Sequence, residues 1–422
     1  MQDSTSLLDE LAWRGLLHQH TEGLAEALAA RSVSAYAGFD PTASSLHVGS
    51  LIPVIGLMHL QRAGHKPFAV VGGGTGLIGD PSGKTVERQL NTLETVEENS
   101  RALRAQLERF LDFTGPDAAE MRDNADWLRP LGAIEFMRDI GKHFTVNYML
   151  QKESVQQRMD AGISYTEFSY MLLQAYDFRE LFRRDGVTLQ VGGSDQWGNI
   201  TAGLELIRRT EGGEAHALTF PLVTNASGTK FGKTESGNVW LDPERTSPYQ
   251  FYQFWVNVED RDAARYLKFF TLLSRKEIEN LEREIAESPQ NRAAQRALAD
   301  EVTTRVHGGT AARIAADVSK LLFAKGDPAS LSIEALEALS REVPFIEMPQ
   351  LGNVVDGLVA LGLAASKGAA RRLVEQGGAS VNGRRVAGVA DPLGDPLHGS
   401  YYLLRKGAKD YGLIKAIGGL ED

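Results

Sequence analysis

The sequence predicts an α/β fold: a Rossmann-like, doubly wound parallel sheet with a helical insertion, then an α-helical domain and a small α+β module. The main observation is a strand–loop–helix–strand order over residues 33–71, which is typical of parallel sheets whose strands are joined by helices. A second strand–glycine–helix segment follows residue 187. The chain of 422 residues, with 42% apolar and 24% charged residues, is long enough for several domains with buried cores.

The elements of the first part follow from local patterns. Pro53 suits the first turn of a helix and Gly64 suits a helix end. The expected elements are an amphipathic helix over 1–30, a strand over 33–39, a helix over 51–63, a buried strand over 68–71, a polar helical stretch over 87–111, a strand over 187–191 and a helix over 197–209.

The rest of the chain changes character after Lys233. Asp260, Ser274 and Ser288 are candidate caps of a helix-rich stretch. The expected domains are a catalytic nucleotide-binding domain with a helical insertion over 1–235, a helical domain over 236–325, a linker over 326–350 and a small module over 351–422.

Composition excludes several classes of protein. The chain has no cysteine, so disulfides, thiolate nucleophiles and cysteine-bound zinc are excluded, and its nine histidines show no metal-ligand spacing. The acidic N-terminus is unlike a signal peptide, and no apolar stretch approaches the ~20 residues of a membrane span. We therefore expect a cytoplasmic protein with no bound metal and no membrane partner.

Charge is distributed unevenly along the chain. The net charge is −10, but residues 350–422 carry nine Lys or Arg and seven Asp or Glu. An acidic body with a mildly basic tail suits a catalytic unit joined to a small module that binds RNA or a protein partner, although chance asymmetry gives the same numbers.

The turn before the helix at residue 51 is a candidate phosphate site. A helix N-terminus favours anions through its free amides and its dipole. His47 would lie beside it as a donor, and Gly49 would let a nucleotide approach the backbone. A structural histidine is the ordinary alternative for such a turn.

A second candidate is the polar segment 228–234, where Lys230 and Lys233 flank Gly232. Such a loop can place two ammonium groups over a polyphosphate. It is not a P-loop, because only three residues separate its glycines where that motif needs four. Residues 79–85 have the same defect.

Residues 74–79 match the Gly-x-Gly-x-x-Gly fingerprint of dinucleotide-binding enzymes by letter. However, Asp80 and Pro81 follow where a helix should begin, and the expected acidic residue would fall in the polar helical stretch rather than at a strand end. A nicotinamide oxidoreductase is therefore the alternative, and a weaker one.

Taken together, the two loops resemble a known family. Residues 47–50 (HVGS) are similar to the HIGH motif of class I aminoacyl-tRNA synthetases, and residues 230–234 (KFGKT) are similar to their KMSKS motif. Four longer strings resemble the tyrosyl branch of that family: YAGFDPT at 36–42, GDPSGK at 79–84, YMLLQAYD at 170–177 and GGSDQWGNI at 192–200. The resemblance extends over essentially the whole chain. Ser50 replaces the second histidine of HIGH, and Ala37 stands where this branch often has cysteine.

The resemblance implies a tyrosine–tRNA ligase, which activates L-tyrosine with ATP and transfers it to tRNA(Tyr). Tyr170, Gln174 and Asp177 share one helix face by their spacing, and an internal polar network is the ordinary alternative. By resemblance, Asp177 and Tyr36 bind the phenol hydroxyl of tyrosine, Tyr170 and Gln174 bind its α-amino group with Asp80 nearby, and Gln190 and Gln196 line the same cleft.

The resemblance also implies the ATP site. His47 and Thr42 would hold the γ-phosphate side, Lys230 and Lys233 would clamp the pyrophosphate, Lys84 and Arg88 would assist, and Mg²⁺ would be carried on the phosphates. The full set of ATP-binding residues implied is Gly38, Asp40, His47, Gly49, Ser50, Gly193, Asp195, Lys230, Phe231, Gly232, Lys233 and Thr234. The family is homodimeric, which points to the 133–141 region as part of a dimer surface.

The last module resembles a small RNA-binding domain shared with a ribosomal protein. Ser366 would cap a short basic helix, and Asn382–Gly383 favours a type I′ hairpin. The candidate RNA-binding residues are Lys367, Arg371, Arg372, Arg384 and Arg385. Two alternatives within the resemblance are a tryptophanyl enzyme, disfavoured by Tyr36 and Asp177, and an inactive RNA-binding relative, disfavoured by the two loop lysines.

Overall fold

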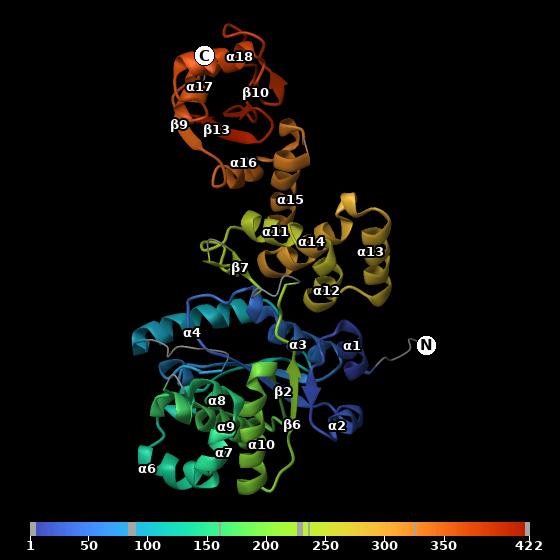
Figure 1. Ribbon diagram of the computed structural model, residues 1–422, viewed down its shortest axis with the longest axis vertical. Helices are drawn as coiled ribbons and strands as arrows, with labels where there is room; N and C mark the ends of the chain where they lie inside the picture. Colours follow the sequence, from blue (N-terminus) through green and yellow to red (C-terminus); the bar gives the residue numbers. More distant parts are fainter. Residues whose placement is uncertain are drawn as a thin grey trace. The chain divides into compact units, whose positions relative to one another are not determined.

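The structure, a computed structural model, describes residues 6–82, 90–159, 162–225, 231–234, 237–324 and 326–417. The chain forms two units, drawn in Figure 1: Met1–Thr246 with Val258–Leu298, and Ser247–Asn257 with Ala299–Asp422. The helical stretch expected over 236–325 is therefore divided between the two units.

A six-stranded sheet organises the first unit, in the order β1-β6-β5-β2-β3-β4. Its four inner pairings are parallel, and only the short edge strand β1 is antiparallel to its neighbour β6. The predicted parallel α/β sheet is confirmed, with one antiparallel edge added. The strands are β1 (Gln19–His20), β2 (Ser34–Phe39), β3 (Lys66–Val71), β4 (Glu120–Asp123), β5 (Leu189–Gly193) and β6 (His216–Phe220).

Helices cover both faces of this sheet, as expected for strands that are apolar on both sides. On one face, Tyr36 of β2 and Phe68 of β3 pack with Phe178 and Leu181 of α9 (Tyr165–Asp185) and with Ile207 of α10 (Trp197–Thr210). On the other face, α3 (Leu51–Arg62) contacts β2, β3, β5 and β6. Figure 1 shows α9 and α10 on one side of the sheet and α3 and α4 (Leu93–Leu107) on the other.

The N-terminal 30 residues differ from the single helix that was predicted. They form α1 (Leu7–Arg14) and α2 (Leu24–Ala30) on either side of β1. Gly15 and Gly23 have φ angles of 73° and 79°, a left-handed backbone that interrupts a helix. The polar helical stretch expected over 87–111 is also shorter, because Thr92 caps α4 by accepting a bond from the Thr95 amide.

The helical insertion lies between β4 and β5, and its buried core includes Ile140, Met149 and Met171. It ends in α9, whose N-cap Ser164 accepts from the Glu167 amide. Its other elements are α5 (Ala125–Leu128), α6 (Ala133–Glu135), the π-helical turn η3 (Phe136–Ile140), η4 (Gly141–His143), α7 (Val146–Leu150) and α8 (Glu153–Met159).

The remaining elements of the first unit follow its last long strand. Ser274 begins α13 with a reciprocal capping box to Glu277, which confirms that predicted cap. They are the hairpin β7 (Lys233–Thr234) and β8 (Gly237–Asn238), α12 (Asp260–Phe270), α13 (Arg275–Glu287) and η6 (Pro289–Asn291). Helix α14 (Ala293–His307) begins in the first unit and ends in the second.

The second unit contains a five-stranded sheet in the order β11-β10-β12-β13-β9, which confirms a small α+β module at the end of the chain. Its strands are β9 (Phe345–Met348), β10 (Ala379–Val381), β11 (Arg384–Arg385), β12 (Tyr401–Lys406) and β13 (Asp410–Ala416). Its helical elements are α11 (Pro248–Val256), α15 (Gly309–Ala324), η7 (Pro328–Ser330), α16 (Ile333–Leu339), α17 (Val354–Ala360) and α18 (Lys367–Glu375).

The segment 326–350, expected as a linker, is built into this unit. Helix α16 buries Leu336 and Leu339 against Leu403 and Leu413 of the sheet, and β9 pairs in parallel with β13. The low apolar periodicity that favoured a linker reflects the shortness of these elements, each of which contributes only a few buried residues.

Candidate active site

A cavity of about 340 Å³ lies at the carboxyl ends of β2, β3 and β5, the edge at which parallel α/β sheets bind ligands. Most of the predicted site residues share it. Those that line it are Tyr36, Gly38, Asp40, Thr42, His47, Gly49, Ser50, Asp80, Tyr170, Gln174, Asp177, Gln190, Gly193, Asp195 and Gln196.

Asp177 lines the cavity and is buried. Its carboxylate accepts hydrogen bonds from Trp127 Nε1 at 2.7 Å and Asn124 Nδ2 at 2.8 Å. Burial raises the pKa of Asp177 to about 8, although these two bonds oppose the change. An acidic group is thus held in an apolar setting where its charge depends on what binds next to it.

Tyr36 and Gln190 enter the cavity from the sheet, and both are buried. Neither the Tyr36 hydroxyl nor Gln190 Oε1 has a hydrogen-bond partner among the described residues. Burial, with the nearby Asp177 carboxylate, raises the pKa of Tyr36 well above its usual value, so its hydroxyl stays protonated. Because a buried polar group without a partner is costly, these atoms mark a place for polar groups of a ligand.

A chain of hydrogen bonds joins Asp177 to other polar residues of the cavity lining. Asn124 donates to Thr75 Oγ1 at 2.9 Å, and Thr75 donates to Asp40 Oδ1 at 2.7 Å. The other Asp40 oxygen accepts from the Tyr170 hydroxyl at 2.8 Å. Tyr170 and Asp40 are therefore fixed relative to Asp177 by a connected polar network rather than by separate contacts.

Asp80 occupies a second polar position in the cavity. Its Oδ2 accepts from Gln196 Nε2 at 2.6 Å, while its Oδ1 accepts from the Ser82 amide at 2.9 Å and from Asn199 at 3.4 Å. Asp80 and Gln196, predicted from separate strings, are thus direct partners.

The phosphate-site turn takes a defined form. His47 is the N-cap of the short helix η1 (Val48–Ser50), which continues into α3, and its Nδ1 accepts from the Gly49 amide at 3.0 Å. In the neutral ring the proton then resides on Nε2. Ser50 lines the same cavity.

The two predicted loops meet at Val239. Its carbonyl accepts from the Val48 amide at 3.0 Å, and its own amide donates to the Gly232 carbonyl at 3.0 Å. A Cβ added at Gly232 would lie 2.5 Å from Val48 Cγ2. Gly232 is therefore the residue that lets the backbone of one loop approach the other this closely.

Some predicted residues lie elsewhere. The Phe231 side chain, expected near ATP, is buried against Tyr266 and Phe270 of α12 and does not line the cavity. For Lys233 and Thr234 the structure gives the backbone of β7, which pairs with β8. Lys84, Arg88 and Lys230 lie outside the described residues.

The sequence did not single out Asn124, Trp127, Thr75 or Asn199, which hold the acidic groups of the cavity in place. Asn124 follows β4 directly. The sequence of that strand, Glu120–Asp123, is polar and so was not predicted as a strand. Recognising these residues as a strand would have placed Asn124 at the ligand-binding edge of the sheet.

In the second unit, all five predicted RNA-binding side chains are exposed. Ser366 caps α18, and Asn382 and Gly383 have φ angles of 48° and 81°, as a type I′ turn requires. Arg385 donates to the Gly377 carbonyl at 2.9 Å and so also holds the end of α18.

Comparison with known proteins decides the family. The family model for class I tRNA synthetases (W and Y) matches residues 28–324. The chain belongs to this family. The model of the SYY-like C-terminal domain of tyrosine–tRNA ligases matches residues 335–414.

Individual class I synthetases agree with this assignment. The chain is 55% identical to a tyrosine–tRNA ligase of Anaeromyxobacter dehalogenans, with 97% of this chain and 99% of that protein covered. It is 54% identical to that of Bacillus caldotenax at the same coverage. Its structure is similar to that of a C-terminally truncated mitochondrial tyrosyl-tRNA synthetase of Aspergillus nidulans, with a TM-score of 0.69 and 30% identity over 76% of this chain and 95% of that one.

Two further findings concern membrane spans and metal sites. Within the described part of the chain, no helix is long and apolar enough to span a membrane. Over the same residues, no group of three or more His, Asp or Glu side chains is arranged to hold a metal ion.

Proposed function

We propose that this protein is a tyrosine–tRNA ligase, which joins L-tyrosine to ATP as tyrosyl-adenylate and then transfers the tyrosine to tRNA(Tyr). The observation that carries the proposal is the pair of buried groups in the cavity lining, the Asp177 carboxyl and the nearby unpartnered Tyr36 hydroxyl. The full-length similarity to tyrosine–tRNA ligases supports it.

Selection of tyrosine follows from this pair. A phenol hydroxyl donating to Asp177 and accepting from Tyr36 would satisfy both groups, whereas phenylalanine would leave them without partners in a buried site. This argument is already the accepted account of how tyrosyl enzymes reject phenylalanine, and it is applied here to Asp177 and Tyr36. At the other end, Tyr170, Gln174 and Asp80 are placed to bind the α-amino group.

Activation needs little from the protein beyond position and charge. The tyrosine carboxylate attacks the α-phosphorus of ATP and pyrophosphate leaves, so no general base is required. His47 would offer its Nε2–H to the phosphates, with Thr42 beside it. Lys230 and Lys233 would bind the departing pyrophosphate, with Lys84 and Arg88 assisting. Mg²⁺ would arrive on the phosphates of ATP.

The RNA partner would be bound in part by the C-terminal module. Lys367, Arg371, Arg372 and Arg384 are exposed cations on one helix and one hairpin. Arg384 also lines a hollow of about 820 Å³, together with Arg405 and Asn382. Two aspartates, Asp327 and Asp395, line the same hollow, so the cations proposed to bind RNA phosphates are the exposed ones on α18 and the hairpin.

Self-association would use the helical insertion. Large apolar side chains are exposed there: Ile134, Met137, Val146, Met159 and Tyr165. The 133–141 region expected from the sequence contributes the first two. Exposed apolar residues on one insertion suit a protein–protein interface, and a second copy of the chain is the proposed partner.

The test is tyrosine-dependent exchange between ATP and labelled pyrophosphate, run in parallel with phenylalanine and tryptophan. We expect exchange with tyrosine at a rate far above that with either competitor. Exchange driven by tryptophan would identify a tryptophanyl enzyme, and no exchange with any of the three would overturn an activating function. Charging of tRNA(Tyr) by the same preparation tests the second step.

A further inference from the structure

Helix α12 contacts the chain at Thr224 and at Phe231, which lie before and within the segment that carries Lys230 and Lys233. The Phe231 ring stacks on Phe270 with a centroid separation of 5.0 Å and meets the edge of Tyr266 at the same separation. Upstream of the loop, the Thr224 carbonyl accepts from the Tyr266 hydroxyl at 3.3 Å and from the Arg265 guanidinium. The place of Phe231, which lies between Lys230 and Lys233 in the sequence, is therefore set by α12.

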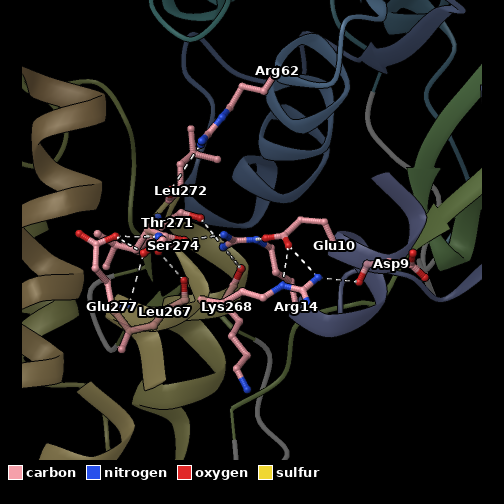
Figure 2. A network of polar contacts seen from close by, with 12 residues as sticks. Asp9, Glu10, Arg14, Arg62, Leu267, Lys268, Thr271, Leu272, Ser274 and Glu277 are labelled. Atoms are coloured by element: carbon pink, nitrogen blue, oxygen red, sulfur yellow. Dashed lines mark hydrogen bonds and ion pairs between the residues drawn. The ribbon is translucent and has the colours of Figure 1, made fainter. Parts of the chain in front are cut away.

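The end of α12 is held in turn by one buried side chain, Arg14 of α1. Its Nη1 donates to the Lys268 carbonyl at 3.1 Å and to the Thr271 carbonyl at 2.8 Å, and its Nη2 donates to the Leu273 carbonyl at 2.6 Å. Figure 2 shows this network. The last carbonyls of a helix lack partners within the helix, and a cation there interacts favourably with the helix dipole. The Arg14 guanidinium therefore both supplies hydrogen-bond donors to these carbonyls and places a positive charge at the negative end of the dipole.

Arg14 is itself fixed. Its Nε donates to Glu10 Oε1 at 2.7 Å, and Arg275 holds the other Glu10 oxygen at 2.9 Å. Only 3% of the surface of Arg14 is exposed, so it has no solvent-facing alternative for its charge. Beside it, a Cβ added at Gly15 would lie 3.2 Å from the Phe269 ring, so α1 packs closely on α12.

The same turn also contacts α3, the helix that follows the short helix capped by His47. Arg62, at the end of α3, donates to the Leu272 carbonyl at 3.3 Å, as Figure 2 shows. The turn 271–274 is therefore bonded both to the last residue of α3 and, through Arg14, to α1, while α12 itself packs on Phe231.

We propose that Arg14 is a positioning residue for adenylate formation, which sets α12, and through Phe231 the backbone of residues 231–232, against the His47 turn. The inference rests on the proposed phosphate-binding role of Lys230 and Lys233. The hydrogen bonds of Arg14 go to Glu10 and to three carbonyls at the end of α12, and none of these four residues lines the cavity. Arg14 therefore acts on the site through α12.

The test compares the full-length Arg14→Gln variant with the full-length wild type in steady-state pyrophosphate exchange. Gln keeps a donor but cannot bridge three carbonyls. Because a small displacement of a phosphate-binding group costs rate, we expect kcat/KM for ATP to fall roughly 10- to 100-fold. The dissociation constant of tyrosine, measured by equilibrium dialysis, should stay within about twofold, since a placement error of this kind changes the ATP step alone. Arg14→Lys, which keeps the charge, should recover part of the loss.

The matched control is Arg275→Gln. It removes the other guanidinium on Glu10 but leaves every bond from Arg14 to the α12 turn, so kcat/KM for ATP should fall much less than in Arg14→Gln. Coupling is tested by combining Arg14→Gln with Phe231→Leu. If both act through the same contact, the double variant loses less than the product of the two single losses.

Several results would overturn the inference. Equal losses in ATP and tyrosine parameters would indicate general destabilisation, and multiplicative losses in the double variant would separate Arg14 from Phe231. If Arg14→Gln does not fold, Phe270→Leu provides the same test from the other side of α12 and must show the same ATP-only loss. Lys233→Ala distinguishes the two levels: unchanged exchange there defeats the proposed lysine role, whereas reduced exchange with a normal Arg14→Gln defeats only the role of Arg14.

Discussion

His47 accepts a hydrogen bond at Nδ1 from the amide of Gly49, two residues further on, at 3.0 Å. The bond fixes the orientation of a histidine ring that lies in a loop at the edge of the cavity. It also explains the glycine, because a Cβ at residue 49 would lie 2.8 Å from His47 Cε1 and 2.9 Å from Nδ1.

Gly49→Ala should therefore act as a His47 variant. The methyl group must push the imidazole aside, and the loss of one well-placed phosphate donor typically costs ~10²-fold or more in rate. We expect pyrophosphate exchange to fall toward that of His47→Ala. Gly309→Ala, at a glycine whose added Cβ meets nothing within 4 Å, is the control and should be neutral. Full exchange activity in a folded Gly49→Ala protein would contradict the role of His47.

Asp177→Asn should weaken selection of tyrosine. The variant keeps the size of the side chain but replaces one acceptor oxygen with a donor amide, so the buried phenol hydroxyl would lose its acceptor at a cost of about 1–3 kcal/mol. The ratio of kcat/KM for tyrosine over phenylalanine should fall roughly 10- to 100-fold. Arg183→Gln, an exposed residue on the same helix, should leave the ratio unchanged. A preserved ratio in Asp177→Asn would show that another group recognises the hydroxyl.

The stability of the free protein should depend on pH through Asp177. Burial raises the pKa of this carboxyl from 3.8 to about 8, so the folded protein binds a proton that the unfolded chain has lost. This contribution to stability is fully present below pH 3.8 and is lost as the pH rises through about 8. The urea midpoint of the wild type, relative to Asp177→Asn, should therefore decrease between pH 5 and pH 8. A difference that does not vary with pH would contradict the burial effect.

Charge removal on the C-terminal module should weaken tRNA binding without affecting activation. The test variant changes three arginines together to Gln: Arg371, Arg372 and Arg384. Its affinity for tRNA(Tyr) should be lower than that of the wild type. The slope of log affinity against log salt should decrease by roughly one for each phosphate that is no longer neutralised. Pyrophosphate exchange should be unchanged. Arg283→Gln, an exposed cation in the first unit, is the control. An unaltered salt slope would show that these residues do not contact the RNA.

The oligomeric state should depend on the exposed apolar residues of the insertion. Ile134 and Met137 are 77% and 55% exposed, and Asp at both positions would place charge in a contact that excludes water. Analytical ultracentrifugation should show a dimer for the wild type and a monomer for this variant. Phe323→Asp, at a residue 69% exposed in the other unit, should remain a dimer. A monomeric wild type would refute the proposed interface.

Local sequence determined much of this protein. The strands predicted at 33–39 and 68–71 and the helix predicted at 51–63, observed at 34–39, 66–71 and 51–62, follow from short apolar runs, Pro53 and Gly64, because such patterns act within a few residues. The motif strings identified the family and most of the polar residues that line the cavity, because chemistry requires particular side chains at fixed spacing.

Only the tertiary structure decided what lies between those strings. The strand 120–123 pairs with β3 at the edge of the sheet, a position where a polar sequence is tolerated. That pairing brings Asn124 and Trp127 to Asp177. Segment 326–350 is ordered by burial of Leu336 and Leu339 against strands some 65 to 80 residues away in the chain. Arg14 meets the carbonyls that follow α12 over more than 250 residues of chain. Such contacts depend on which distant segments are packed together, and no local sequence pattern identifies the partner.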